Sequence, residues 1–159
     1  MRSNAQVVVR RAVAAEIDRV VEIERGAEEA SHWSSAVYAK YVDRTRDQLF
    51  HRCLLVATVD EGVTGFTVGS FLEGNEAAVL ESVVVDATWR RKGIATALCA
   101  AIADWARGEG ARAVELEVRA ENDAARAMYG RLGFVESGRR KDYYSNPVDD
   151  AVLMRLRLE

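Results

Sequence analysis

The chain has 159 residues, of which 49% are hydrophobic and 30% charged, a composition typical of a folded domain and not of a disordered chain. Its formal net charge of −3 argues against general nucleic-acid binding, because nucleic-acid-binding domains are usually basic. The longest mostly apolar stretch, residues 94–103, falls short of the roughly 18 residues that span a bilayer, and the N-terminus lacks the apolar core of a signal peptide. We therefore expect one cytoplasmic domain, covering residues 1–159.

The first half of the chain predicts two helices and an antiparallel meander. Residues 7–11 are typical of a strand, and residues 15–25 carry apolar side chains at helical spacing with charges on the opposite face. Ser34 or Ser35 is a suitable N-cap for a second helix. Three strands connected by turns are expected to follow, at residues 53–59, 63–71 and 77–85.

In the second half, helices and strands alternate. Residues 94–105 predict a helix with one apolar face, which two glycines end. Ala113–Arg119 alternates between apolar and charged residues, as a half-buried strand does, and Asn122 is the expected N-cap of another helix. Short strands are predicted at residues 134–138 and 151–158. Because a helix separates the strands at 77–85 and 113–119, we expect these two to be parallel neighbours in a mixed sheet of an α/β domain.

Cysteines and histidines indicate neither a disulfide framework nor a metal site. Cys53 and Cys99 lie among apolar neighbours, as buried thiols in a reducing compartment do; a reactive thiol is the alternative. The only histidines are His32 and His51, and His51 beside Cys53 lacks the further ligands that zinc needs. We expect no bound metal.

The clearest sign of a ligand is the segment 86–96, where an apolar strand runs into the first turn of a helix. Three basic residues, Arg90, Arg91 and Lys92, precede Gly93. The start of a helix has about four unbonded N–H groups and a partial positive charge of about +0.5, so basic residues are misplaced there unless an anion binds. The segment therefore predicts a phosphate or pyrophosphate site; a basic turn without a ligand is the alternative.

A second group of polar residues accompanies the strand Ala113–Arg119. Glu117 points away from the apolar face of this strand, and Tyr129 lies two helical turns after Asn122. Because parallel strands part at their carboxyl ends, where α/β proteins commonly bind ligands, both side chains can reach one cleft. The alternatives are a solvated carboxylate and a packed aromatic ring.

Together these residues resemble the GNAT N-acetyltransferases. The run 90–95 is similar to the family's acetyl-CoA loop [RQ]-x-x-G-x-[GA], with Ala95 in place of the commoner glycine. Residues from Leu80 onward resemble the RimI-like branch, which acetylates the N-terminal amine of a ribosomal protein; before residue 77 only His32-Trp33-Ser34 supports the resemblance. The resemblance implies an α/β (α+β) fold with a mixed sheet of about seven strands, helices on both faces and a splayed parallel pair that holds the cofactor.

The resemblance also implies roles for individual residues. Acetyl-CoA is the implied cosubstrate, and the residues implied to contact it are Val83, Val84, Val85, Arg91, Lys92, Gly93, Ile94, Ala95, Thr96 and Asn122. Glu117 is the implied general base and Tyr129 the implied general acid. Acceptor contacts are implied for Trp33, Tyr143 and Tyr144, the last two within residues 139–147, which we expect to form a loop between the last two strands.

The implied reaction is direct acetyl transfer to a protein N-terminus. An α-amine with a pKa of about 7.7–8.0 is partly neutral near pH 7, whereas a lysine near 10.4 is almost fully charged, which favours the α-amine. The resemblance implies that residues 12–35 border the acceptor groove, where acidic side chains would favour a basic acceptor; a solvated helix face is the alternative. The acidic residues are Glu16, Asp18, Glu22, Glu24, Glu28 and Glu29.

Other acceptors and other roles stay open at this point. The same machinery serves acetylation of a lysine side chain or a small amine, and a module that only binds acetyl-CoA is the non-enzymatic alternative. The expected partner is the N-terminus of a ribosomal protein, with no nucleic acid or membrane involved and with the protein itself a monomer or weak dimer.

Overall fold

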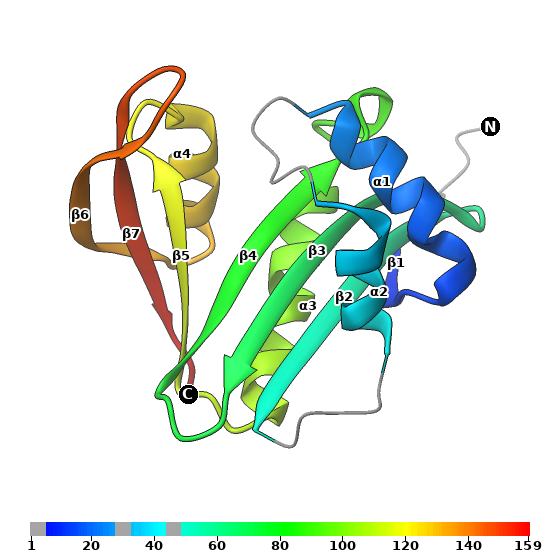
Figure 1. Cartoon of the computed structure of the whole chain (residues 1–159), viewed down its shortest axis with the longest axis horizontal. Coiled ribbons are helices and arrows are strands. Elements are labelled where there is room, and N and C mark those ends of the chain that lie inside the picture. The colour runs from blue at the N-terminus through cyan, green and yellow to red at the C-terminus, as the bar shows by residue number, and fades with distance from the viewer. Residues whose placement is uncertain (1–5, 28–32, 44–48) are drawn as a thin grey trace.

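A seven-stranded mixed sheet forms the centre of the protein (Figure 1). The computed structural model describes residues 6–27, 33–43 and 49–159. The strand order is β1-β2-β3-β4-β5-β7-β6, and every neighbouring pair is antiparallel except β4 and β5. The strands are β1 (Val8–Arg11), β2 (Phe50–Val59), β3 (Gly62–Leu72), β4 (Ala77–Val85), β5 (Ala113–Arg119), β6 (Val135–Tyr144) and β7 (Asp149–Arg157). The predicted meander and the parallel pair are confirmed.

Helices cover both faces of this sheet (Figure 1). On one face lie α1 (Ile17–Arg25), which follows a 3-10 turn η1 (Ala14–Glu16), and α2 (Ser35–Val42). Their apolar side chains share a core with the sheet that includes Val20, Tyr38 and Phe66. On the other face lie α3 (Ile94–Gly108), which follows the 3-10 turn η2 (Ala87–Trp89), and α4 (Asp123–Arg131).

Side-chain caps begin two of the helices, as the sequence predicts. The Ser34 hydroxyl accepts a hydrogen bond from the Val37 N–H at the start of α2. The Asn122 side chain accepts one from the Ala125 N–H at the start of α4. Each cap satisfies a backbone donor that the first turn of a helix leaves without an intrahelical partner.

The parallel strands β4 and β5 pair only near their beginnings. The register joins Ala77 to Ala113 and ends with Val79 opposite Glu115. Beyond this point β4 bulges: Leu80 lies opposite Gly69 of β3 and Ser82 opposite Val68, which leaves Glu81 without a partner residue on β3. A bulge bends a strand and increases its twist, so β4 and β5 diverge toward their carboxyl ends (Figure 1). This is the splayed pair that the sequence resemblance implies.

The last hairpin corrects one prediction. The sequence predicts a strand at 134–138 and a loop at 139–147, but β6 extends from Val135 to Tyr144 and pairs with β7, so only residues 145–148 form the turn. The prediction was wrong because β6 is an edge strand with most residues exposed on both faces. Such a strand lacks the alternation of apolar and polar residues that reveals a half-buried strand.

Both cysteines are buried, as expected for structural thiols. Burial raises the pKa of the Cys99 thiol to about 12, which keeps it protonated and unreactive at neutral pH. Within the described parts of the chain, no helix is long and apolar enough to cross a membrane.

Candidate active site

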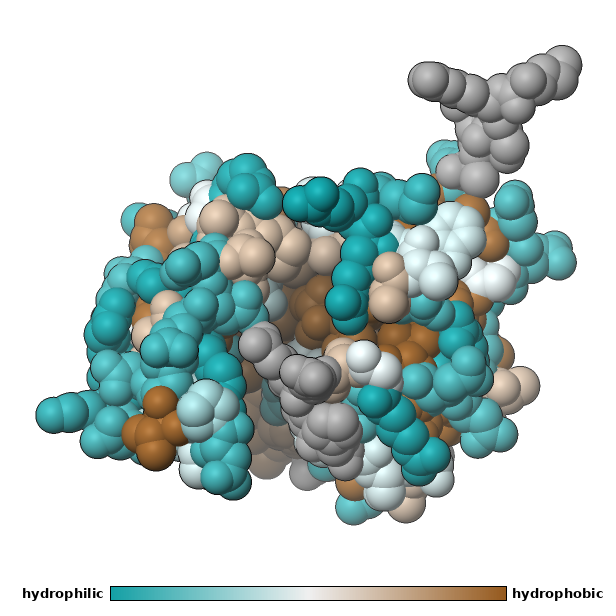
Figure 2. Space-filling model, turned by 90° about the horizontal axis from the view of Figure 1, so that it is seen from above, coloured by the Kyte–Doolittle hydropathy of each residue, from teal (hydrophilic) through white to brown (hydrophobic). Residues whose placement is uncertain are grey.

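A cleft of about 1200 Å³ opens where β4 and β5 part. Seen from above, the molecule is hollowed between the half that carries β5–β7 and the half that carries α1, and apolar residues are visible inside the hollow (Figure 2). The lining comes from β4, the loop that follows it, the first turn of α3, β5, α4 and the end of β6. Two strands with unpaired edges and one helix N-terminus therefore face the same space.

The N-terminus of α3 is suited to an anion. Its N-cap, Gly93, has φ 78° and ψ 8°, and no side chain caps the helix. The first turn contains no acidic residue, while Arg90 and Arg91 also line the cleft. The N–H groups that Ser34 and Asn122 satisfy in the other helices have no side-chain acceptor here, so a phosphate oxygen can take that place.

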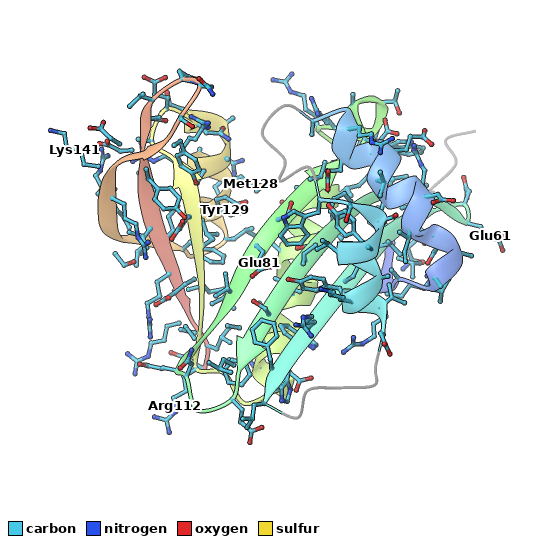
Figure 3. The ribbon with its side chains drawn as sticks, in the orientation of Figure 1. Glu61, Glu81, Arg112, Met128, Tyr129 and Lys141 are labelled. Atoms are coloured by element: carbon cyan, nitrogen blue, oxygen red, sulfur yellow. The ribbon has the colours of Figure 1, made fainter. Side chains whose placement is uncertain are left out.

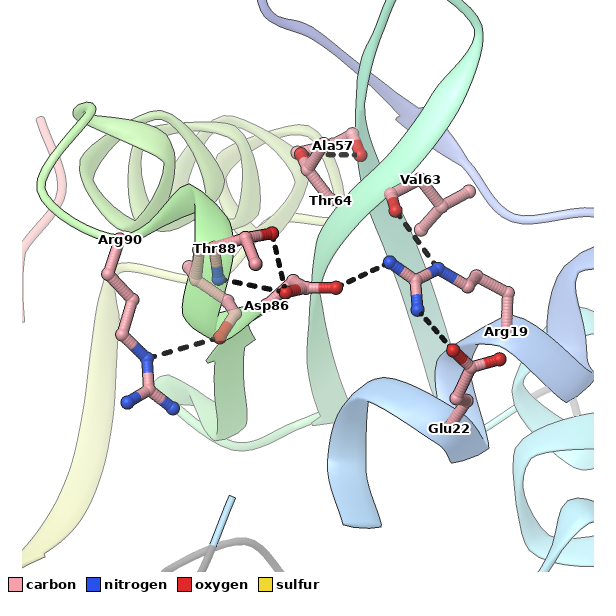
Figure 4. Close-up of polar contacts among 9 residues, drawn as sticks. Arg19, Glu22, Ala57, Val63, Thr64, Asp86, Thr88 and Arg90 are labelled. Carbon is pink, nitrogen blue, oxygen red and sulfur yellow. Dashed lines mark hydrogen bonds and ion pairs between the residues drawn. The ribbon is translucent and has the colours of Figure 1, made fainter. Parts of the chain in front are cut away.

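The loop between β4 and α3 is tied to α1 (Figure 4). Asp86 accepts hydrogen bonds from the Thr88 N–H (3.0 Å) and hydroxyl (2.9 Å), and from Arg19 Nη2 (2.5 Å). Arg19 also donates to the Val63 carbonyl and to Glu22. These bonds, the one from the Thr88 N–H first, hold the pKa of Asp86 below its usual range. The loop is thus positioned from the opposite face of the sheet.

The structure brings almost all of the predicted cofactor residues to this cleft. The exception is Lys92, whose ammonium lies 5.9 Å from the centre of the Trp89 ring. The predicted residues that do line the cleft are Val83, Val84, Val85, Arg91, Gly93, Ile94, Ala95, Thr96 and Asn122.

Tyr129 lines the cleft from α4, and Figure 3 shows it with Met128 on the side of β5 that faces β4. Tyr129 is 9% exposed, and its ring packs edge-on against Phe134 with ring centroids 5.7 Å apart. Burial raises the pKa of Tyr129, and the neighbouring Cys99 and Tyr144 raise it further. The phenol therefore keeps its proton at neutral pH and can donate it to a group in the cleft.

Glu117 reaches the cleft from β5. Its neighbours Leu116 and Val118 are buried in the core shared with α3 and α4, so Glu117 points to the opposite face of the sheet. Its Oε1 lies 3.6 Å from Arg140 Nη2 on β6. Tyr143 donates a hydrogen bond to the same carboxylate, which raises the pKa of Tyr143. The last hairpin therefore orients the predicted base.

The predicted acceptor residues occupy different environments. Tyr144 lines the cleft, and the Arg119 guanidinium lies 4.5 Å above its ring. Tyr143 is exposed and outside the lining, although it contacts Glu117. Trp33 also lies outside the lining and stacks on Tyr41 of α2 with ring centroids 5.5 Å apart. Its sequence neighbour His32 is outside the described residues.

Glu81 is a cleft residue that the sequence analysis missed. It lines the cleft from the bulge of β4 and accepts hydrogen bonds from the Tyr41 hydroxyl (2.7 Å) and the Ser70 hydroxyl (3.0 Å) (Figure 3). One signal was present in the sequence, since Glu81 and Ser82 interrupt an otherwise apolar strand. No group of three or more His, Cys, Asp or Glu side chains in the described part of the chain is arranged to hold a metal ion.

Comparison with known proteins gives matches across the chain. Residues 17–134 match the model of the acetyltransferase (GNAT) family. The ribosomal protein bS18-alanine N-acetyltransferase of Escherichia coli K12 is 37% identical over 83 residues, which are 51% of this chain and 56% of that protein. The N-alpha-acetyltransferase RimI of Mycobacterium tuberculosis is 40% identical over 76 residues, which are 48% of this chain and 46% of that protein. The chain therefore matches about half the length of these curated relatives.

A solved structure matches over nearly the whole chain. The crystal structure of the ribosomal-protein-S18-alanine N-acetyltransferase from Escherichia coli has a TM-score of 0.80 and 25% identity, and the match covers 97% of this chain and 95% of that one. The splayed parallel strands, the uncapped helix beside them and the family model across most of the sequence agree with one another. This chain belongs to the acetyltransferase (GNAT) family.

Proposed function

We propose that this protein transfers the acetyl group of acetyl-CoA to the α-amino group of a protein N-terminus, with a ribosomal protein as the acceptor. One observation carries the proposal: Glu117 and Tyr129 line the same cleft as the uncapped N-terminus of α3. A proton acceptor, a proton donor and an anion site thus share one space. The names of the two curated relatives support the choice of acceptor: one is an acetyltransferase of a ribosomal protein and the other an N-alpha-acetyltransferase.

The residues of the cleft fit acetyl-CoA. The first turn of α3 offers backbone N–H groups to a diphosphate, and Arg90 and Arg91 add positive charge. Beyond Val79, the edge of β4 that faces β5 has no strand partner, so the backbone at Val83–Val85 is open to an extended, amide-containing arm. Bound acetyl-CoA would supply a thioester whose carbonyl carbon accepts the amine.

Glu117 and Tyr129 supply the proton transfers in this proposal. As the new C–N bond forms, Glu117 takes a proton from the attacking nitrogen, directly or through a water molecule. As the C–S bond breaks, Tyr129 gives its proton to the departing sulfur. Its raised pKa means that the phenol is still protonated at that point. One proton leaves nitrogen and one reaches sulfur, so the transfer balances without an acyl-enzyme and without either cysteine.

A peptide panel tests the proposed function. Purified protein and acetyl-CoA are incubated with a peptide that has a free α-amine and an internal lysine, with the same peptide blocked at its α-amine, and with small diamines. Mass spectrometry is expected to find one acetyl group on the α-amine of the free peptide and none on the blocked peptide. Acetylation of the lysine or the diamines at an equal or higher rate would contradict the proposal. The Glu117→Gln variant controls for non-enzymatic transfer.

A further inference from the structure

Glu81 and Glu117 occupy equivalent places on the two parting strands. The parallel ladder ends with Val79 opposite Glu115, and each glutamate lies two residues further along its strand. Glu81 contacts α2 through Tyr41, and Glu117 points away from the core of α3 and α4, so both side chains are on the face that carries α1 and α2. Tyr129 belongs to the core on the opposite face. An acceptor that approaches Glu117 from the α1–α2 face therefore passes Glu81.

The two carboxylates differ in their charge partners. Glu117 lies beside Arg140, whereas the described residues include no arginine, lysine or histidine within ion-pair distance of Glu81. Both oxygens of Glu81 accept hydrogen bonds, but the donors, Tyr41 and Ser70, are neutral hydroxyls. Burial and the bond to Glu81 raise the pKa of Tyr41, so Tyr41 keeps its proton and remains a donor. Neutral donors thus hold the half-buried Glu81 carboxylate in a fixed orientation, and the described residues give it no ion pair, although the Arg52 guanidinium lies 5.8 Å from the centre of the Tyr41 ring.

Three of the acidic residues of 12–35 are engaged within the protein, whereas Asp18, in the first turn of α1, is exposed. Glu16 forms a two-bond ion pair with Arg10, and Glu22 pairs with Arg19. Glu24 is 1% exposed and accepts a hydrogen bond from Tyr38. Glu28 and Glu29 are outside the described residues. Residues 12–35 therefore attract a basic acceptor less strongly than their number of acidic residues indicates.

We infer that Glu81 is a specificity residue of the acceptor site: it binds a positively charged side chain near the N-terminus of the acceptor, while Glu117 faces the reacting amine. This inference rests on the proposed function and names its substrate class, a protein N-terminus with an arginine or lysine at the second or third position. The cation completes a site in which Tyr41 and Ser70 already fix the carboxylate.

Three peptides test this inference. They are identical except that one has glutamine at positions two and three, and the others have arginine at position two or at position three. The wild-type protein is expected to acetylate at least one arginine peptide with a kcat/KM about 10- to 100-fold higher than the glutamine peptide, the range of a hydrogen bond to a charged group. Glu81→Gln is expected to reduce this preference to less than about twofold.

Matched variants separate this role from a structural one. Glu81→Gln retains an oxygen that can accept the Tyr41 hydrogen bond, so its Tm is expected to stay near wild type. The preference is the ratio of the kcat/KM values for two peptides on the same variant, so a general loss of activity does not change it. Glu81→Asp keeps the charge and is expected to keep part of the preference. Glu115→Gln removes a carboxylate from the same face of β5, one that pairs with Arg155 and lies outside the cleft, and is expected to leave the preference unchanged.

The outcomes distinguish this inference from the proposed function. If wild-type protein acetylates all three peptides equally well, or if Glu81→Gln retains the full preference, the inference is overturned while N-terminal acetylation stands. If no peptide is acetylated, the proposed function fails and the inference fails with it.

Discussion

The two sides of the cleft are built from different parts of the chain. On the side of α3, the groups that face the cleft are mainly backbone: the uncapped first turn after Gly93 and the open edge of β4. On the side of α1 and α2, they are side chains, with Glu117 held by β6 and Glu81 held by α2 and β3. Backbone groups suit the binding of acetyl-CoA, which is the same in every reaction. Side chains can be substituted one at a time, so they suit the recognition of a particular acceptor. Variants on the two sides should therefore affect different kinetic constants.

The largest effect is expected from Glu117→Gln. Removal of the proton acceptor is expected to lower kcat by about 10²- to 10⁴-fold, while the Kd for acetyl-CoA stays within about twofold of wild type. Steady-state CoA release measures the first quantity and calorimetry the second. Equal losses in kcat and in acetyl-CoA affinity would contradict the separation of the two sides of the cleft.

Tyr129→Phe is expected to lower kcat by about 10²-fold with little change in acetyl-CoA affinity, because the ring and its packing against Phe134 remain. Unchanged turnover in this variant would remove Tyr129 from the reaction.

The pH dependence of the free energy of unfolding tests the burial of the Tyr129 phenol. Its pKa is raised in the folded protein, so folding is unaffected by this group below the unfolded tyrosine pKa of about 10 and is opposed by it above that pH. Wild-type protein is therefore expected to lose stability more steeply than Tyr129→Phe above about pH 10. Urea unfolding at a series of pH values measures the difference. Parallel curves for the two proteins would contradict a raised pKa of Tyr129 in the folded protein.

Gly93→Ala tests the backbone side of the cleft. A Cβ on Gly93 would meet no atom within 4 Å, so the cost of the change comes from its φ of +78°. This conformation costs an alanine about 1–2 kcal/mol, which corresponds to a Kd for acetyl-CoA raised by about 5- to 30-fold if the turn relaxes. The kcat at saturating acetyl-CoA is expected to stay near wild type. A fall in kcat without a change in the Kd for acetyl-CoA would contradict the assignment of Gly93 to the acetyl-CoA site.

The smallest effect is expected from Asp86→Asn. This change weakens the contact with Arg19 that joins the β4–α3 loop to α1, and contacts of partly exposed ion pairs are worth little. We expect a rise of about two- to fivefold in the KM for acetyl-CoA and no change in acceptor preference. Arg19→Gln should have a similar effect, and the double variant should be no worse than either single one.

The difference between the two sides also explains what the sequence could predict. A backbone site requires a glycine, small residues and a helix start within one short segment, so 86–96 was recognisable from local pattern alone. The carboxylate of Glu81 depends on Tyr41 and Ser70, which lie 40 and 11 residues away along the chain on other elements. No spacing rule connects them, because only the tertiary fold brings them together.

The fold shows the same contrast. Elements with one buried face, such as α3 and β5, were predicted close to their observed bounds because burial imposes a periodic pattern. The edge strand β6, exposed on both sides, carries no such pattern and was predicted too short. Trp33, which the resemblance assigns to the acceptor site, stacks on Tyr41 of α2, and its contact with an acceptor stays a prediction.

A crystal structure of the protein with coenzyme A tests the central claim most directly. We expect the diphosphate to lie against the N–H groups of the first turn of α3, between β4 and β5, and the sulfur to lie within about 4 Å of the Tyr129 hydroxyl with Glu117 facing the same point. Coenzyme A bound outside this cleft, or a sulfur beyond reach of Tyr129, would contradict the account.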